Sequence, residues 1–134
     1  MPDVGKFFQM CKEAGIKISI VSHKTRFPSD PSVQVDLREA AWNWMKKYKF
    51  FSDYGFGLKP DQIFFESSRD KKIDRIRALR CTHFIDDLEE ILMAEKFPEY
   101  VRPMLFAPSK SNKGATSYDV FNSWNDIRHE FLSC

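Results

Sequence analysis

Two adjacent aspartates, Asp86 and Asp87, follow a predicted strand over residues 82–85. Neighbouring carboxylates repel each other, which is costly unless a cation or hydrogen-bond donors compensate. Mg²⁺ prefers carboxylate and water oxygens, so it would relieve this repulsion. The alternative is that one aspartate caps the following helix while the other is solvated. The position at the end of a strand favours the metal, and both residues are candidate Mg²⁺ ligands.

A serine and a lysine add the groups that an anion site needs. Ser22 ends the apolar run 16–21, where its hydroxyl and nearby backbone amides can hydrogen-bond a phosphate oxygen. Lys72 lies in the first turn of a predicted helix, where a cation is mildly unfavourable against the helix dipole. Each has an ordinary alternative: a turn serine, and a lysine on a solvated helix face. Together, the order Ser, Lys, Asp-Asp is much more specific than any one of these residues alone.

Short strands and amphipathic helices alternate around these residues. Strands are predicted at 16–21, 63–65, 82–85 and 104–106. Helices are predicted between Asp3 and Gly15, from Asp36 to Tyr48, after Ser67 or Ser68, over 88–92, and after Ser123. The segments 26–31 and 108–117 read as loops. This alternation predicts an α/β fold with a mostly parallel sheet that is covered on both faces.

The parallel arrangement decides where the polar residues meet. Ligands of such sheets bind beyond the carboxyl ends of the strands. Predicted strands end at Ser22, at Glu66, at Asp86 and Asp87, and at the loop that begins with Ala107. The helix that carries Lys72 begins shortly after Glu66. We therefore expect these residues to gather along one edge of the sheet.

Composition bounds the class of protein. The 134 residues read as a single domain (1–134) with a net charge of only +2, too small to indicate nucleic acid. We expect no membrane span, because the longest apolar runs are a handful of residues. Cys11, Cys81 and Cys134 fit neither a disulfide framework nor a zinc pattern. We expect reduced thiols in a cytoplasmic protein.

Three segments together resemble motifs II, III and IV of the haloacid dehalogenase-like (HAD-like) hydrolase superfamily. They are ISIVSHKT around Ser22, SSRDKKIDRI around Lys72, and THFIDDLEEIL around Asp86 and Asp87. The resemblance implies a three-layer Rossmann-like core and Mg²⁺-dependent phosphohydrolase chemistry on a phosphorylated small molecule. By the same likeness Ser22 would bind the transferring phosphoryl group, Lys72 would neutralise its charge, and the aspartates would hold Mg²⁺.

The first motif of that superfamily, a strand that ends in DxD and supplies the nucleophile, has no counterpart here. Asp3 has no strand before it and reads as a helix cap. The remaining residues would bind phosphate and Mg²⁺ without forming an aspartyl-phosphate. We therefore expect a HAD-like phosphohydrolase domain, incomplete and without turnover. The alternative is a non-catalytic phosphate-binding, ligand-binding or regulatory module on the same fold.

The absent motif also implies an absent strand. In the superfamily that strand lies between the strands that here end in Ser22 and Asp86, so these two would lose ladder partners. Three outcomes follow from the resemblance. The two strands pair directly, a segment of another subunit fills the gap, or the chain is a fragment of a longer gene product. A homodimer would be one way of covering the exposed strand edges.

Overall fold

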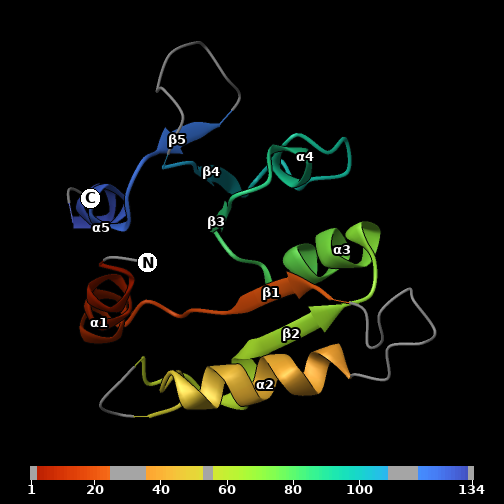
Figure 1. Ribbon diagram of the computed structural model, residues 1–134. Helices are drawn as coiled ribbons and strands as arrows, with labels where there is room; N and C mark the ends of the chain where they lie inside the picture. Colours follow the sequence, from red (N-terminus) through yellow and green to blue (C-terminus); the bar gives the residue numbers. More distant parts are fainter. Residues whose placement is uncertain (1–2, 25–35, 53–55, 109–117, 133–134) are drawn as a thin grey trace.

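The computed structural model describes residues 3–24, 36–52, 56–108 and 118–132, and these form a mixed α/β fold with five α-helices and small parallel sheets (Figure 1). The elements in chain order are α1 (Val4–Ala14), β1 (Ile20–His23), α2 (Leu37–Lys47), a 3₁₀ turn (Pro60–Gln62), β2 (Ile63–Glu66), α3 (Arg69–Leu79), β3 (His83–Asp86), α4 (Glu89–Leu92), β4 (Arg102–Phe106), β5 (Asp119–Phe121) and α5 (Trp124–Leu132). None of the helices in the described ranges has the length and apolar character that crossing a membrane requires.

All strand pairs are parallel, as predicted, but the strands form two sheets. β1 pairs with β2, with Val21 opposite Phe64, and β3, β4 and β5 form the second sheet, with Ile85 opposite Met104. Within the described residues no ladder joins β1 to β3, and Figure 1 shows the two strands apart. The first of the three outcomes, direct pairing of these strands, is therefore wrong for this structure.

Side-chain caps begin three of the helices at the predicted residues. Asp36 Oδ1 accepts hydrogen bonds from the backbone N–H groups of Arg38 and Glu39, at 3.0 and 3.1 Å. Ser68 caps α3, and the Ser123 hydroxyl accepts a backbone hydrogen bond in the first turn of α5. Such caps satisfy N–H groups that have no partner inside the helix, and each typically stabilises by about 1 kcal/mol. Local sequence therefore fixes where these helices begin.

The first helix begins differently from the prediction. Asp3 occupies the N-cap position of α1, but its side chain accepts no capping hydrogen bond. Its backbone is left-handed, with φ of 68°, and its carboxylate instead forms an ion pair with Lys6 at 3.5 Å. The far end agrees with the prediction, because Gly15 stops the helix with a φ of 73°.

Two strand assignments need correction. The strand predicted at 16–21 begins only at Ile20, because the chain opposite residues 16–19 is the 3₁₀ turn that Pro60 opens. A 3₁₀ turn cannot form a β-ladder with a neighbouring segment. The side-chain amide of Gln62 donates a hydrogen bond to the Ile18 carbonyl oxygen instead. Strand β5 (Asp119–Phe121) was not predicted. The predicted loop 26–31 and nearly all of the loop 108–117 lie outside the described residues.

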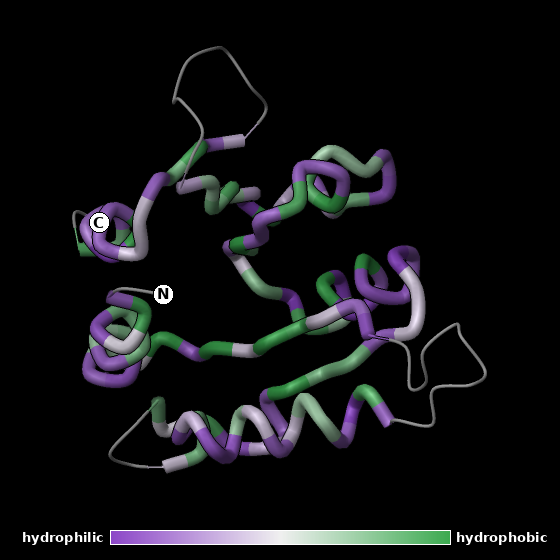
Figure 2. Tube along the Cα trace, in the orientation of Figure 1, coloured by the Kyte–Doolittle hydropathy of each residue, from purple (hydrophilic) through white to green (hydrophobic). Residues whose placement is uncertain are grey.

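The hydrophobic core connects elements from opposite ends of the chain. Phe7 and Cys11 of α1 pack against Met104 of β4 and Ile127 of α5. A second cluster places Phe8 of α1 against Met45 of α2 and Ile63 of β2, and a third places Ile76 of α3 against Ile91 and Val101. In Figure 2 the hydrophobic colouring runs along β1, whereas α2 alternates between polar and apolar residues.

The two described cysteines are free thiols, and Cys134 lies outside the described residues. Cys11 is 1% exposed, and burial raises the pKa of its thiol to about 11. At about pH 8 its thiolate fraction is therefore on the order of 0.1%, and reagents reach it poorly. We expect iodoacetamide, followed by peptide mass mapping, to label Cys81 well before Cys11 in the folded protein. In denaturant the two should react alike, and equal rates in the folded state would contradict this assignment.

Candidate functional site

Polar residues gather on the side where β1, β2 and β3 end, which we call the carboxyl edge. The Lys72 Nζ, in the first turns of α3, donates to Asp86 Oδ2 at 2.8 Å, and Asp86 is the last residue of β3. His23, the last residue of β1, has its Nε2 3.2 Å from the Ser67 carbonyl oxygen just beyond β2. These contacts bring the carboxyl ends of the three strands together, as a parallel arrangement predicts.

The Lys72–Asp86 ion pair is buried. The two side chains are only 8% and 6% exposed, and the ammonium also lies 5.7 Å from the centre of the Phe84 ring. Charges are almost never buried to this extent unless they are paired. The neighbouring lysine, Lys71, is exposed and lies near Ser67 instead.

Asp86 also shapes the turn into α4. Its Oδ1 accepts the backbone N–H of Leu88 at 3.0 Å, so one aspartate of the pair does perform the capping role that the sequence left open. Capping alone, however, does not call for a buried lysine on the other carboxylate oxygen. Asp86 therefore has both oxygens engaged, one by a helix-turn amide and one by a cation.

Asp87 is exposed and remains close to its neighbour. Partial burial raises the pKa of the Asp87 carboxyl, and a hydrogen bond with Asp86 and the negative charge of Asp86 raise it further. The positive charge of Lys72 acts in the opposite direction and lowers the pKa of Asp87, but this contribution is smaller. The crowding of two carboxylates that the sequence predicted is thus present, and Lys72 forms an ion pair with only Asp86.

Ser22 lies at the same edge but in the other sheet. It is half-buried in β1, where it pairs with Phe65 of β2. In the part of the chain that the structure describes, no hydrogen bond joins the Ser22 hydroxyl to Lys72 or to Asp86. The structure therefore brings Lys72, Asp86 and Asp87 together and leaves Ser22 beside them as a separate contributor.

Two further ion pairs surround this edge and were not predicted. Arg69 and Glu90 connect the starts of α3 and α4 at 2.7 Å, and Arg75 contacts Glu66 at 3.3 Å. The arginine of the second pair also lies over the Phe64 ring, 4.6 Å from its centre. Glu66 ends β2, and the sequence placed it at this edge, but its ion pair with Arg75 was not predicted.

The donor set limits what metal this edge can hold. Within the described ranges no group of three or more His, Cys, Asp or Glu side chains is arranged to hold a metal ion. Asp86 and Asp87 supply two carboxylates, and Mg²⁺ commonly takes one or two carboxylates with waters and phosphate oxygens as its other ligands. The residues present fit an open Mg²⁺ site of that kind, and Lys72 would compete with such a cation for Asp86.

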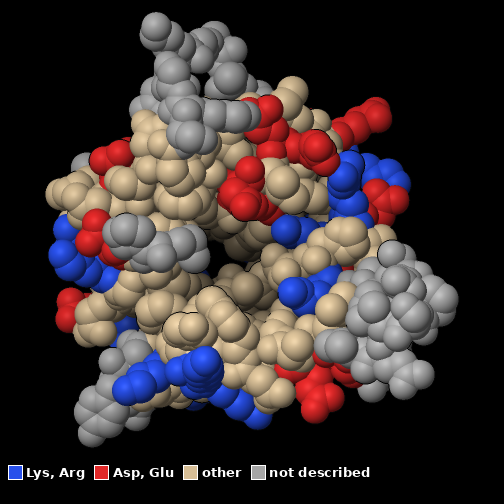
Figure 3. All heavy atoms as spheres, in the orientation of Figure 1, with Lys and Arg blue, Asp and Glu red and all other residues tan. Residues whose placement is uncertain are grey.

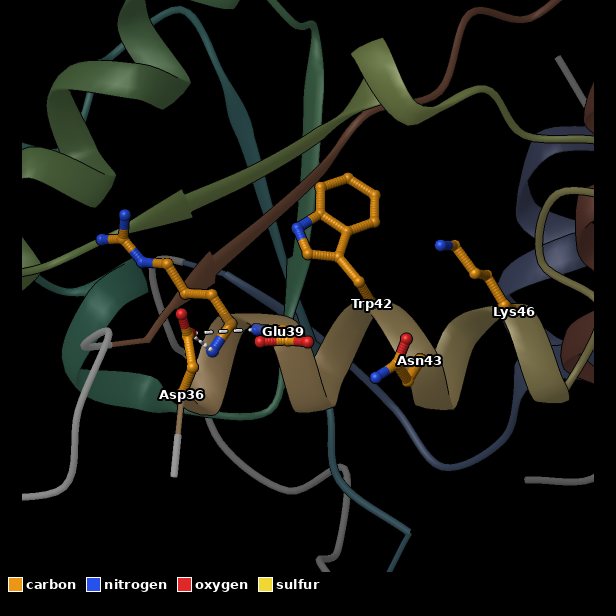
Figure 4. A pocket seen from close by; sticks show the side chains of 6 residues that line it. Asp36, Glu39, Trp42, Asn43 and Lys46 are labelled. Carbon is orange, nitrogen blue, oxygen red and sulfur yellow. Dashed lines mark hydrogen bonds between the residues drawn. The ribbon is translucent and has the colours of Figure 1, made fainter. Parts of the chain in front are cut away.

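A surface pocket lies elsewhere, along α2. Asp36, Glu39, Trp42, Asn43 and Lys46 line it, and Figure 4 shows them projecting from successive turns of the helix. The Asp36 carboxylate is committed to the helix cap, as the dashed lines in Figure 4 mark. None of the four predicted site residues lines this pocket, so it does not extend the carboxyl edge.

Comparison with known proteins adds no assignment, because no family model, no curated protein and no solved structure matches this chain.

Proposed function

We propose that the chain is a HAD-like phosphohydrolase domain that binds Mg²⁺ and a phosphorylated small molecule without turning it over. The observation that carries the proposal is the buried Lys72–Asp86 pair with Asp87 next to it at the carboxyl edge. A cation and two carboxylates at the ends of parallel strands are the inventory of a phosphate and metal site. The proposal includes the three-layer Rossmann-like core and a cytoplasmic location.

Each residue has a defined part in this proposal. Asp87 and the remaining lone pairs of Asp86 would hold Mg²⁺, and the ion would supply positive charge to offset that of the phosphate. The Ser22 hydroxyl, one residue before the end of β1, would donate to the phosphate. Lys72 would orient Asp86 and offset the charge at the edge. No described carboxylate stands free at the end of another strand to attack phosphorus, so we expect binding without an aspartyl-phosphate.

The alternative is a non-catalytic module that binds a phosphate or another ligand and serves regulation. The pairing of both Asp86 oxygens favours it, because a fully engaged carboxylate is a weaker metal ligand. A phosphatase assay with an aryl phosphate and Mg²⁺ tests the absence of turnover that both hypotheses share. We expect no hydrolysis above background, and turnover that disappears in Asp87→Asn would contradict the absence of chemistry.

Magnesium affinity should depend on Asp87. We expect Asp87→Asn to weaken Mg²⁺ binding by about tenfold or more in isothermal titration calorimetry, because the one carboxylate without a lysine partner is lost. Asp74→Asn is the matched control. It makes the same change of charge on the exposed face of α3, where Asp74 pairs with Arg77. Equal affinity in the two variants would contradict the site.

The affinity should also fall as the pH is lowered. Mg²⁺ competes with the proton for Asp87, and the raised pKa of this carboxyl means that protonation begins at a higher pH than for an ordinary aspartate. A titration series at decreasing pH would measure the effect. An affinity that stays constant until the ordinary aspartate range would count against Asp87 as the ligand.

A further inference from the structure

The C-terminal end of α2 carries two aromatic side chains that remain largely exposed. Trp44 and Tyr48 are 52% and 53% exposed, and because they are four residues apart they share one face of the helix. Their ring centroids lie 4.7 Å apart, and the half-buried Phe50 ring lies 5.5 Å from that of Trp44. The pair is therefore supported by a packed neighbour and still faces solvent.

Three exposed lysines lie at the same end of the helix. Lys47 follows Trp44 by three residues, and its ammonium lies 5.7 Å from the centre of the Tyr48 ring. Lys46 and Lys49 stand on either side of these two residues in the sequence, and within the described ranges none of the three lysines forms an ion pair. Figure 3 shows Lys and Arg side chains gathered over this end of α2, at the lower left of the view. The end of the helix therefore carries positive charge that no described carboxylate neutralises.

The helix dipole accounts for the lysines but not for the rings. Cations in the last turn of a helix are favoured by the dipole, which gives Lys46 and Lys47 a structural role. It gives no reason for exposing a tryptophan beside them, since burial of an aromatic ring is strongly favourable. The helix also keeps its acidic side chain off this face. Glu39 lines the pocket on the other flank of α2, and an exposed alanine, Ala40, stands one turn before Trp44.

The shape of this face favours a broad surface over a small ligand. The pocket along α2 is lined by Trp42 and Lys46 on the other flank, and neither Trp44 nor Tyr48 belongs to it. The two exposed rings already touch each other, so no planar group can enter between them. Tryptophan and tyrosine favour the boundary between lipid and water, because their rings are apolar and their N–H and O–H ends are polar. Lysine stems lie along apolar surface while their ammonium groups meet anions.

We propose that this face of α2, formed by Trp44, Lys47, Tyr48 and Lys49, docks on the surface of an anionic phospholipid bilayer. The two rings enter the headgroup layer, and the lysines lie against the negative headgroups. Met45 holds the inner side of α2 in the core, so only this flank reaches the lipid and the contact is peripheral and reversible. The inference rests on charge complementarity and on the exposed rings, and it is independent of the proposed phosphate and metal site.

Vesicle sedimentation tests the proposal on the full chain. Sucrose-loaded vesicles consist either of phosphatidylcholine alone or of phosphatidylcholine mixed with phosphatidylserine, and the partition coefficient is measured at low ionic strength. Lys47→Gln combined with Lys49→Gln removes two charges from the face. Lys71→Gln combined with Lys96→Gln is the matched control, because it removes two exposed charges elsewhere.

We expect the chain to sediment with the mixed vesicles and not with phosphatidylcholine alone. A lysine near an anionic surface contributes about fivefold to the affinity, so the Lys47 and Lys49 substitutions together should lower the partition coefficient by about tenfold or more. The control pair should lower it by less than about threefold, because those lysines lie away from the lipid. Equal losses in the two double variants would overturn the proposal, since the net charge alone would then attract the chain.

The rings are tested separately from the charges. Trp44→Ala combined with Tyr48→Ala should weaken binding to the mixed vesicles by about tenfold, whereas Tyr100→Ala, at a residue 58% exposed elsewhere, should have little effect. Unchanged binding of the Trp44 and Tyr48 double variant would overturn the docking geometry. A single-stranded oligonucleotide is the competing probe. Oligonucleotide binding that this double variant abolishes, without binding to the mixed vesicles, would show that nucleic acid is the occupant and would also overturn the proposal.

Discussion

Replacing Lys72 with methionine is expected to lower the free energy of unfolding by about 3–5 kcal/mol. The methionine keeps most of the volume but leaves the Asp86 carboxylate buried without its cation, and breaking a buried ion pair from one side typically costs this much. Because small domains are stable by only about 5–15 kcal/mol, the variant should unfold at much lower urea concentrations. Urea titration monitored by circular dichroism measures the shift.

Two further variants separate the charge effect from general damage. Lys71→Met makes the same chemical change one residue earlier at an exposed position and should alter stability by less than about 0.5 kcal/mol. Lys72→Met combined with Asp86→Leu removes both charges and should recover much of the loss, because a buried pair replaced by apolar groups is often close to neutral. If the double variant is as unstable as the sum of the single ones, the pair is not coupled as the structure describes.

Shortening Ile127 to alanine is the second substitution with a large expected effect, about 2–5 kcal/mol. Ile127 is 0% exposed and lies where α5 meets Phe7 and Cys11 of α1 and Met104 of β4. The substitution removes buried methyl and methylene groups and leaves a cavity where three elements meet. The free energy of unfolding from urea titration gives the magnitude.

Leu132→Ala is the matched control for that experiment. Leu132 lies on the same helix and is 57% exposed, so the loss of a similar side chain should cost less than about 1 kcal/mol. Trp124, whose ring lies 5.2 Å from the rings of both Phe7 and Phe106, reports on the junction through its fluorescence. A cost for Ile127→Ala no larger than that for Leu132→Ala would contradict the packing.

The sequence predicted the helices better than the sheets, for a physical reason. Asp36, Ser68 and Ser123 act on amides within three residues of themselves, so their capping roles can be read locally. A strand depends on a distant partner, and for that reason residues 16–19 remained outside β1 although their composition favours a strand. β1 and β3 do not pair with each other. Whether they pair depends on how whole layers of the fold pack, and a local sequence pattern carries no information about that.

The sequence predicted where the candidate site lies better than it predicted which of its side chains contact each other. The alternation of strands and helices placed Lys72, Asp86 and Asp87 at one edge, and the structure brings these three together. The sequence did not show that Lys72 would be buried against Asp86, because that depends on the distance between α3 and β3. The roles of Ser22 and of the proposed Mg²⁺ remain predictions, as does the resemblance to HAD-like hydrolases.

The contact between α1 and α5 also bears on the order of folding. Phe7 lies 5.7 Å from the ring of Phe131, so this contact closes a loop of more than a hundred residues, and the loss of chain entropy grows with loop length. The ladders of β1 with β2 and of β3 with β4 close much shorter loops and can form earlier. We therefore expect each half-sheet to form first and the two ends of the described chain to meet late, which would make the α1–α5 contact the last step of assembly.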